Sequence, residues 1–372
     1  MSQSFLAKEK IMYGDDPLIA YEPDLLYIGD GHFIRGAALL CDPVSGYIAH
    51  IRRQPDSTYP IARPVNRVPL EGRAVLPGLV NGHSHAFQRV IRGRTELRSA
   101  ARDSFWTWRE MMYNATARLS PEDIYDASRM AFLEMILGGI TAVGEFHYIH
   151  RTPRGALYDD PNLIAKEVVR AARSAGLRIA LLRVAYARSG YRVPPDGRQA
   201  RFIEPDAEVF LRHVVNLEGE LKALDSSATE SVPVAWAGVA PHSVRAVPLD
   251  YLREVVAFAD ERQLPVHMHL AEQPAEVSAC RQEYGQTPVA LLAGNNLLSP
   301  RFTAVHAIHI TAEEARLLAD ARARVCACPT TERNLGDGIV PADILFKENV
   351  AVSLGTDSHA QIDILEDARE LE

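Results

Sequence analysis

From residue 74 onward, short apolar runs alternate with longer segments of helical pattern. The eight runs cover residues 74–80, 141–147, 178–185, 232–239, 264–270, 303–308, 324–328 and 350–354. Most of them are almost continuously apolar, which is typical of parallel strands that are buried on both faces. Eight such strands alternating with helices predict an α/β fold, a (β/α)₈ barrel of the TIM type.

Helical patterns fill most of the gaps between the runs. One helix is expected to begin after Ser120, which is a good N-cap residue and is followed by Pro121 at the first helical position. The pair Gly138-Gly139 should end this helix. Two further helices are expected over residues 206–224 and 248–262.

The residues before the barrel have a different pattern. Short apolar runs at residues 25–28, 36–41 and 46–51 are separated by turn signals, which predicts antiparallel strands. We therefore expect a small N-terminal β domain over residues 1–70, forming an incomplete β-sandwich, and the barrel over residues 71–372. Because the sequence ends soon after the eighth run, we expect a barrel that is truncated after strand 8.

Composition narrows the classes of function. A formal net charge of −8 argues against a nucleic-acid partner. No run reaches membrane-spanning length, and the first 20 residues lack an apolar signal core, so no membrane partner is expected and we predict a cytoplasmic location. The four cysteines include no C-x-x-C pair and are interpreted as buried thiols in a reducing compartment. A homodimer is a candidate assembly.

Histidines and carboxylates stand at the ends of several predicted strands. They are His83 and His85 after the first run, His267, His269 and Glu272 at the fifth, His306 at the sixth and Asp357 at the eighth. Catalytic groups of such barrels lie at the C-terminal ends of the strands, so we expect these side chains to converge at one mouth. Residues i and i+2 of an extended chain point to the same side. Period alone therefore does not choose between His267 and His269.

Three imidazoles and one carboxylate suit zinc or another first-row divalent ion, with one coordination position left for water. Such an ion lowers the pKa of its bound water to about 7. The pattern therefore predicts a hydrolytic site with one divalent metal ion, Zn²⁺ being the first choice.

Longer motifs carry a family resemblance. They are His83-Ser84-His85-Ala86-Phe87-Gln88-Arg89, Asp103-Ser104-Phe105-Trp106-Thr107-Trp108-Arg109-Glu110, Glu145-Phe146-His147-Tyr148, His267-Met268-His269-Leu270-Ala271-Glu272-Gln273, Asn334-Leu335-Gly336-Asp337-Gly338 and Gly355-Thr356-Asp357-Ser358-His359. With these motifs the chain resembles the amidohydrolase superfamily, in its metal-dependent aminohydrolase branch. Within that branch it is similar to the formimidoylglutamate deiminase family. The Phe-Gln pair and the Ser-Phe-Trp-Thr-Trp block are the most specific parts of the match.

The resemblance implies roles for individual residues. The metal ligands would be His83, His85, His269 and Asp357, the residues of proton transfer and polarisation Glu272, His306 and Asp357, and the substrate contacts Gln88, Tyr148, His242 and Arg245. The implied reaction converts N-formimidoyl-L-glutamate to N-formyl-L-glutamate and ammonia in histidine degradation. The implied partner is thus a small dicarboxylate, which the guanidinium of Arg245 can bind through two hydrogen bonds.

Other interpretations remain open from the sequence. The chain could be an aminohydrolase of a nucleobase or another cyclic amidine, or a truncated homologue without activity that serves as a binding partner. Arg245 could form a surface salt bridge, and Tyr148 could pack at the rim. The arginine-rich segment 188–201 is expected to be a long loop that either covers the site or is solvated.

Overall fold

The computed structural model describes residues 16–29, 31–53, 63–96, 105–193, 196–226 and 234–372. By its contacts the chain divides into two compact units, Met1–Pro77 with Ala223–Pro233, and Gly78–Lys222 with Val234–Glu372. None of the described helices is both long and apolar enough to cross a membrane.

The first unit contains a five-stranded sheet. Its strands are β1 (Leu18–Gly29), β2 (His32–Arg35), β3 (Ala37–Cys41), β4 (Ile48–Arg53) and β5 (Val65–Val75). The long strand β1 pairs antiparallel with β2 and β3, and β4 pairs antiparallel with β3. Strand β5 joins β1 in parallel, a pairing that the sequence did not predict.

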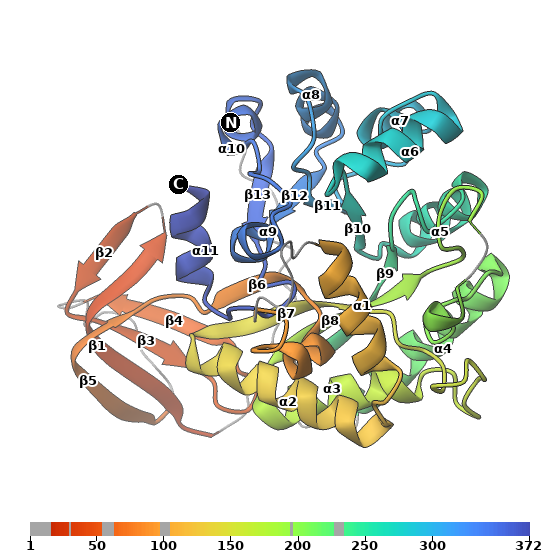
Figure 1. Cartoon of the computed structure of the whole chain (residues 1–372). Coiled ribbons are helices and arrows are strands. Elements are labelled where there is room, and N and C mark those ends of the chain that lie inside the picture. The colour runs from red at the N-terminus through yellow and green to blue at the C-terminus, as the bar shows by residue number, and fades with distance from the viewer. Residues whose placement is uncertain (1–15, 30, 54–62, 97–104, 194–195, 227–233) are drawn as a thin grey trace. The chain divides into compact units, whose positions relative to one another are not determined.

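The second unit is a nearly closed barrel of eight parallel strands (Figure 1). These are β6 (Leu79–Ser84), β7 (Ile140–His147), β8 (Arg178–Ala185), β9 (Ala235–Pro241), β10 (Val266–Leu270), β11 (Phe302–His306), β12 (Arg324–Ala327) and β13 (Ala351–Leu354). Neighbouring strands follow one another in chain order, and a bridge between Ser84 and Asp357 joins the two ends of the sheet. The predicted (β/α)₈ architecture is confirmed.

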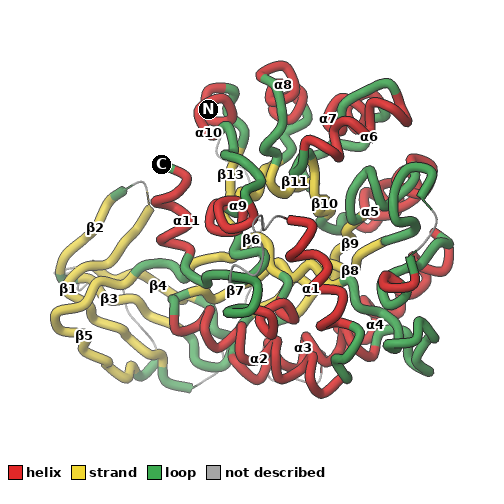
Figure 2. The backbone as a smooth tube through the Cα atoms, viewed as in Figure 1, coloured by secondary structure: helices red, strands yellow, loops and turns green. Residues whose placement is uncertain are grey.

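Helices alternate with the barrel strands, and most of them surround the barrel (Figure 2). They are α1 (Phe105–Thr116), α2 (Pro121–Leu137), α3 (Leu163–Ala175), α4 (Ala207–Ser226), α5 (Leu249–Arg262), α6 (Pro274–Tyr284), α7 (Pro288–Gly294), α8 (Ala312–Asp320), α9 (Pro329–Leu335), α10 (Ala342–Lys347) and α11 (Ile364–Leu371). The short 3₁₀ helices η1 (Ala86–Ile91) and η2 (Gly197–Gln199) lie in loops.

Helix α2 begins and ends where the sequence signals at Ser120 and Gly138-Gly139 predicted, and the hydrogen bonds at its ends explain why. The side chain of Ser120 accepts a hydrogen bond from the backbone N–H of Asp123, whose carboxylate accepts one from the backbone of Ser120. This capping box satisfies two N–H groups that the helix leaves unpaired. At the other end, the cap residue Gly138 is followed by Gly139 with a φ of 81°. A left-handed residue at this position favours glycine and ends the helix.

The first barrel strand differs from the prediction. The apolar run at residues 74–80 is not one strand, because β5 ends at Val75 and β6 begins at Leu79. Pro77 has no N–H to donate to a ladder, and Pro77-Gly78 separates the two strands. As a result His83 lies within β6 and His85 directly after it.

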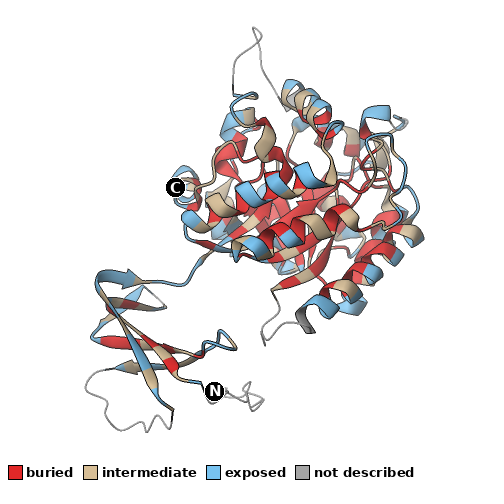
Figure 3. Cartoon of the chain, turned by 90° about the horizontal axis from the view of Figure 1, so that it is seen from below, coloured by how far each residue is buried: buried red, intermediate tan, exposed pale blue. Residues whose placement is uncertain are grey.

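The core of the second unit lies in and around the barrel wall (Figure 3). All five residues of β11 are buried, as are the last five of β8. Burial on both faces of the strands explains their continuous apolar sequences. The polar side chains at the strand ends are therefore held by a rigid, well-packed frame.

Candidate metal centre and substrate pocket

Four predicted ligands meet at the C-terminal mouth of the barrel. The Nε2 atom of His83 lies 3.2 Å from Nε2 of His85 and 3.2 Å from Nε2 of His269. The Oδ1 atom of Asp357 lies 3.3 Å from Nε2 of His83 and 3.2 Å from Nε2 of His85. Ligand atoms about 2.0–2.1 Å from a tetrahedral ion would be roughly 3.3 Å apart. The four donors therefore have the spacing and the chemistry that fit one divalent ion.

Backbone carbonyls orient two of the imidazoles. The Nδ1 atom of His85 donates to the carbonyl of Phe146 at 2.9 Å, and that of His269 to the carbonyl of His242 at 3.2 Å. A proton on Nδ1 leaves a lone pair on Nε2, which is the tautomer that a metal ligand requires. His267, which the sequence left as an alternative to His269, is not among the residues that line the pocket.

Burial and mutual contacts set the charges of this cluster. Burial lowers the pKa of His83 to about 3, so its imidazole is neutral. Burial alone would raise the pKa of Asp357, but its contacts with His83 and His85 outweigh that effect and hold the pKa well below its usual value. Neutral imidazoles around an ionised carboxylate are the protonation states in which these side chains bind metal.

Hydrogen bonds tie the first and last barrel strands together at the cluster. The N–H of Asp357 donates to the carbonyl of His83 at 3.0 Å. The buried carboxylate of Glu145 accepts from the hydroxyl of Ser84 at 2.6 Å and from the N–H of Ala86 at 2.7 Å. These bonds fix the residues on both sides of His85.

Several residues at the mouth have left-handed backbone conformations. The φ angles are 53° at Ala271, 71° at His306 and 40° at Asp357, although none of them is glycine. Such conformations cost of order 1–3 kcal/mol each and are held where the surroundings determine them. Sequence patterns do not reveal them, because side-chain type at these positions gives no turn signal.

Glu272 and His306 lie beside the four ligands, as the resemblance implied. Oε1 of Glu272 is 3.8 Å from Nε2 of His306, which in turn is 4.0 Å from Oδ2 of Asp357. Burial alone would lower the pKa of His306, but Glu272 and the buried Glu332, 3.2 Å from its Nδ1, raise that pKa well above the usual value. Burial raises the pKa of Glu272. Glu332 lies on α9 and was not predicted.

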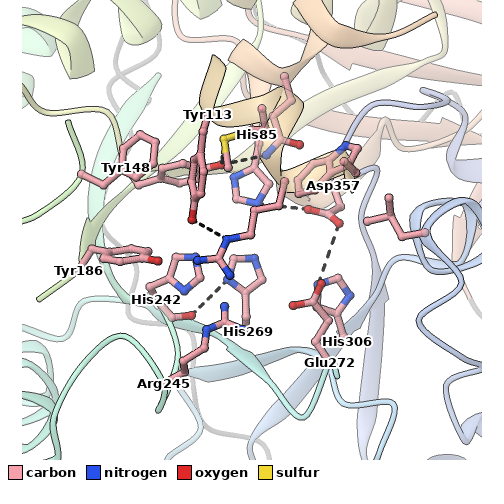
Figure 4. A pocket seen from close by; sticks show the side chains of 16 residues that line it. His85, Tyr113, Tyr148, Tyr186, His242, Arg245, His269, Glu272, His306 and Asp357 are labelled. Carbon is pink, nitrogen blue, oxygen red and sulfur yellow. Dashed lines mark hydrogen bonds and ion pairs between the residues drawn. The ribbon is translucent and has the colours of Figure 1, made fainter. Parts of the chain in front are cut away.

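The four predicted substrate contacts line one pocket that opens on the cluster (Figure 4). The side-chain amide of Gln88 donates to the hydroxyl of Tyr148 at 2.9 Å, so Tyr148 is held in the pocket wall rather than packed at the rim. His242 and Arg245 follow β9. Nε of Arg245 has no hydrogen-bond partner among the described residues, and no ion pair joins this side chain to a described carboxylate. The surface salt bridge considered for Arg245 is therefore not formed within the described chain.

Three further polar residues line the pocket and were not predicted as site residues: Arg109, Tyr113 and Tyr186. Tyr186 directly follows β8, so the rule that strand ends carry functional groups would have found it. Arg109 and Tyr113 lie on α1, and Arg109 donates from Nε to the hydroxyl of Tyr113 at 2.5 Å. Arg109 stands in a motif that marked the family, but nothing in its spacing indicated a pocket.

Comparison with known proteins agrees with this architecture. A sequence model described as the Amidohydrolase family matches residues 74–372. The crystal structure of an amidohydrolase from Brucella melitensis superposes with a TM-score of 0.83 at 32% identity, covering 96% of this chain and 75% of that one. The chain belongs to the amidohydrolase family.

Within this family, two relatives have names that give different substrates. Formimidoylglutamate deiminase of Pseudomonas aeruginosa is 40% identical over 302 residues, which cover 81% of this chain and 64% of that protein. A 5-methylthioadenosine/S-adenosylhomocysteine deaminase of Haloquadratum walsbyi is 27% identical over 367 residues, covering 95% of this chain and 73% of that protein. The chain thus spans just under two thirds of the length of the Pseudomonas relative.

Proposed function

We propose that this chain catalyses hydrolytic deamination, and that its substrate is N-formimidoyl-L-glutamate. The products would be N-formyl-L-glutamate and ammonia. The observation that carries the proposal is the position of two guanidinium groups, those of Arg109 and Arg245, in the wall of the pocket that contains the four-ligand cluster. A dicarboxylate with an amidine-like carbon presents both kinds of group that such a pocket can bind.

The electrostatics of the pocket support an anionic substrate. Burial lowers the pKa of His242 well below its usual value, and the charges of Arg245 and Arg109 lower it further. His242 is therefore neutral, and the positive charge at this wall belongs to the arginines. Guanidinium groups bind carboxylates through paired, charge-assisted hydrogen bonds, each stronger than a bond between neutral groups.

The proton chemistry would fall to the residues beside the cluster. Hydrolysis forms a bond between a water oxygen and the formimidoyl carbon, and it breaks the bond from that carbon to the terminal nitrogen. Asp357 would accept the proton that the water loses. Glu272, whose pKa burial raises, would pass a proton to the departing nitrogen. The protonated His306 would stabilise the negative charge that develops on the way.

The donor set also defines the proposed cofactor. Three imidazole nitrogens and one carboxylate oxygen suit zinc better than magnesium or calcium, which prefer oxygen ligands. When bound, such an ion supplies the nucleophile by lowering the pKa of water. We propose one Zn²⁺ held by His83, His85, His269 and Asp357.

A panel of substrates tests the proposed function. Zinc-loaded protein would be offered N-formimidoyl-L-glutamate, N-formimidoyl-L-aspartate, guanine, adenosine and 5-methylthioadenosine, and ammonia release would be measured. We expect the highest kcat/KM with N-formimidoyl-L-glutamate and no release from the bases and nucleosides. Release from the cyclic compounds alone would show that the relatives acting on nucleosides are the better guide. No release from any compound, with the ion bound, would favour a homologue without activity.

A further inference from the structure

A buried glutamine stands behind two of the tyrosines that line the pocket. Gln199, the last residue of η2, is only 1% exposed. Its Nε2 atom donates to the hydroxyl oxygen of Tyr113 at 2.8 Å and to that of Tyr186 at 2.8 Å. Both tyrosines line the substrate pocket, and Figure 4 shows them on the same side of it. One amide thus joins a side chain of α1 to one at the end of β8.

The hydrogen bonds around Gln199 determine which way its amide points. The N–H of Asp196 donates to the hydroxyl oxygen of Ser189 at 2.9 Å. The Ser189 hydroxyl in turn donates to Oε1 of Gln199. With its oxygen occupied in this way, the amide presents the nitrogen, and both of its N–H groups, to the tyrosines. The segment 188–201, which the sequence left as either a cover or a solvated loop, therefore contributes a buried group that lies behind the pocket wall.

This arrangement controls the hydroxyl protons. An amide nitrogen has no free lone pair, so neither tyrosine can donate its proton to Gln199. The hydroxyl oxygen of Tyr113 also accepts from Nε of Arg109 at 2.5 Å. Burial, together with the neighbouring Tyr113, raises the pKa of Tyr186, which keeps its proton at neutral pH. Even where one tyrosine donates to the other, at least one O–H is left to point into the pocket.

We propose that Gln199 is a positioning residue that stops Tyr113 and Tyr186 from donating a proton away from the pocket, so that their hydroxyls donate to the ligand and favour carboxylates. The inference deepens the proposed function and rests on it for the identity of the substrate. Arg109 and Arg245 line the same pocket, and guanidinium groups also only donate. A carboxylate, which only accepts, complements these donors, whereas the amide N–H groups of a neutral ligand repel them.

Binding of glutarate, an unreactive dicarboxylate, tests the proposal without turnover. Isothermal titration calorimetry would be run on zinc-loaded wild type, Gln199→Glu and Gln199→Leu, with the neutral diamide glutaramide as reference. In Gln199→Glu, the carboxylate that replaces the amide has nearly the same shape but only accepts hydrogen bonds. It would therefore accept the hydroxyl protons of both tyrosines and turn them away from the pocket. We expect glutarate to bind about tenfold more weakly to Gln199→Leu and about 100-fold more weakly to Gln199→Glu, as the loss of charge-assisted hydrogen bonds implies. Glutaramide should change less than twofold.

A matched variant and a mutant cycle separate this role from general damage. Gln282→Glu makes the same chemical change at an exposed position of α6 and should bind glutarate as wild type does. In the background Tyr113→Phe/Tyr186→Phe, Gln199→Leu should change glutarate affinity less than twofold, because the hydroxyls through which it acts are gone. A purely structural role would instead weaken binding equally in both backgrounds.

The outcomes distinguish this proposal from the proposed function. If wild type binds glutarate but releases no ammonia from N-formimidoyl-L-glutamate, the proposed function is overturned. The role of Gln199 is then still decided by the glutarate affinities of its variants. Unchanged glutarate affinity in both Gln199 variants, or no glutarate binding by wild type, would overturn the role of Gln199.

Discussion

The two sides of the pocket are built in different ways. On the metal side, His83, His269 and Asp357 come from the ends of barrel strands, and main-chain hydrogen bonds between strands hold them. On the opposite wall, Arg109 and Tyr113 come from helix α1, and a chain of side-chain hydrogen bonds joins them to Gln199, which lies in a loop behind this wall.

This difference suggests a division of labour. Groups fixed by the barrel frame keep the same geometry whatever ligand is bound, which suits chemistry that is common to a family. Groups fixed by side chains on helices and loops can change without disturbing the barrel, which suits the choice of substrate. Changes on the metal side are therefore expected to reduce turnover, and changes on the wall to weaken substrate binding.

Removal of the metal ion should have the largest effect. Dialysis against a chelator is expected to abolish ammonia release, because the nucleophile depends on the ion. It should also lower the thermal midpoint, since ligands that bind only the folded state stabilise it. Added Zn²⁺ should restore both, as measured by ammonia assay, calorimetry and elemental analysis. Full activity in protein shown to be free of divalent ions would contradict the proposed role of the metal ion.

Glu272→Gln should come next in size. The amide keeps the shape of the side chain but cannot carry a proton to the leaving nitrogen, so kcat should fall about 10³-fold. KM and bound zinc should stay close to wild type. The exposed Glu261 on α5 offers the matched control Glu261→Gln, which should leave kcat unchanged. A loss of zinc in Glu272→Gln would instead assign this carboxylate to metal binding.

On the wall, Arg245→Met should weaken binding without displacing the ion. Removing a charge-assisted contact to a carboxylate is expected to raise KM by about 10- to 100-fold. Zinc content should not change, because no described ligand of the cluster bonds to this side chain. Arg253→Met, on the exposed face of α5, is the matched control. A drop in kcat with unchanged KM would contradict the division between the two sides.

The smallest expected effect concerns stability rather than activity. Glu276, on α6, is buried and accepts from the N–H of Ala271 at 3.0 Å, and burial raises its pKa from 4.5 to about 7. The folded protein then holds a proton that the unfolded chain has already released. This stabilising contribution is complete below pH 4.5 and is lost as the pH rises through about 7.

Glu276→Gln should remove that dependence, because the amide oxygen still accepts from Ala271 and never ionises. We expect the variant to gain about 2 kcal/mol of unfolding free energy relative to wild type between pH 5 and pH 8. Urea unfolding at several pH values measures this, with Glu261→Gln following wild type. Parallel pH curves for wild type and Glu276→Gln would show that this carboxyl does not titrate as described.

Much of the fold could be predicted from the sequence, because its signals are local. The N-cap signal of Ser120 with Pro121 and the continuous apolar runs each depend on neighbouring residues, and they located α2 and seven of the barrel strands closely. The exception is the apolar run at residues 74–80, which was predicted as one strand. It contains the end of β5 and the start of β6, and Pro77 lies between them. The parallel pairing of β5 with β1 joins distant segments and leaves no local signal.

In the site, too, residues placed by a local rule could be predicted, and residues brought in from distant segments could not. The residues at strand ends, such as His83 and Asp357, could be predicted because the barrel brings all strand ends to one mouth. Tyr113, Gln199 and Glu332 could not, since they reach the pocket or His306 from helices and a loop whose paths the sequence does not specify. The left-handed backbone at His306 likewise arises from its surroundings rather than from residue type.

One comparison tests the division between chemistry and selection most directly. The kcat/KM of zinc-loaded protein would be measured for N-formimidoyl-L-glutamate and for the same compound with both carboxylates converted to amides. The reacting carbon is identical, so only recognition by the wall differs. We predict a kcat/KM at least 100-fold higher for the dicarboxylate, consistent with the loss of charge-assisted contacts. Equal values for the two compounds, or no ammonia from either, would contradict the account.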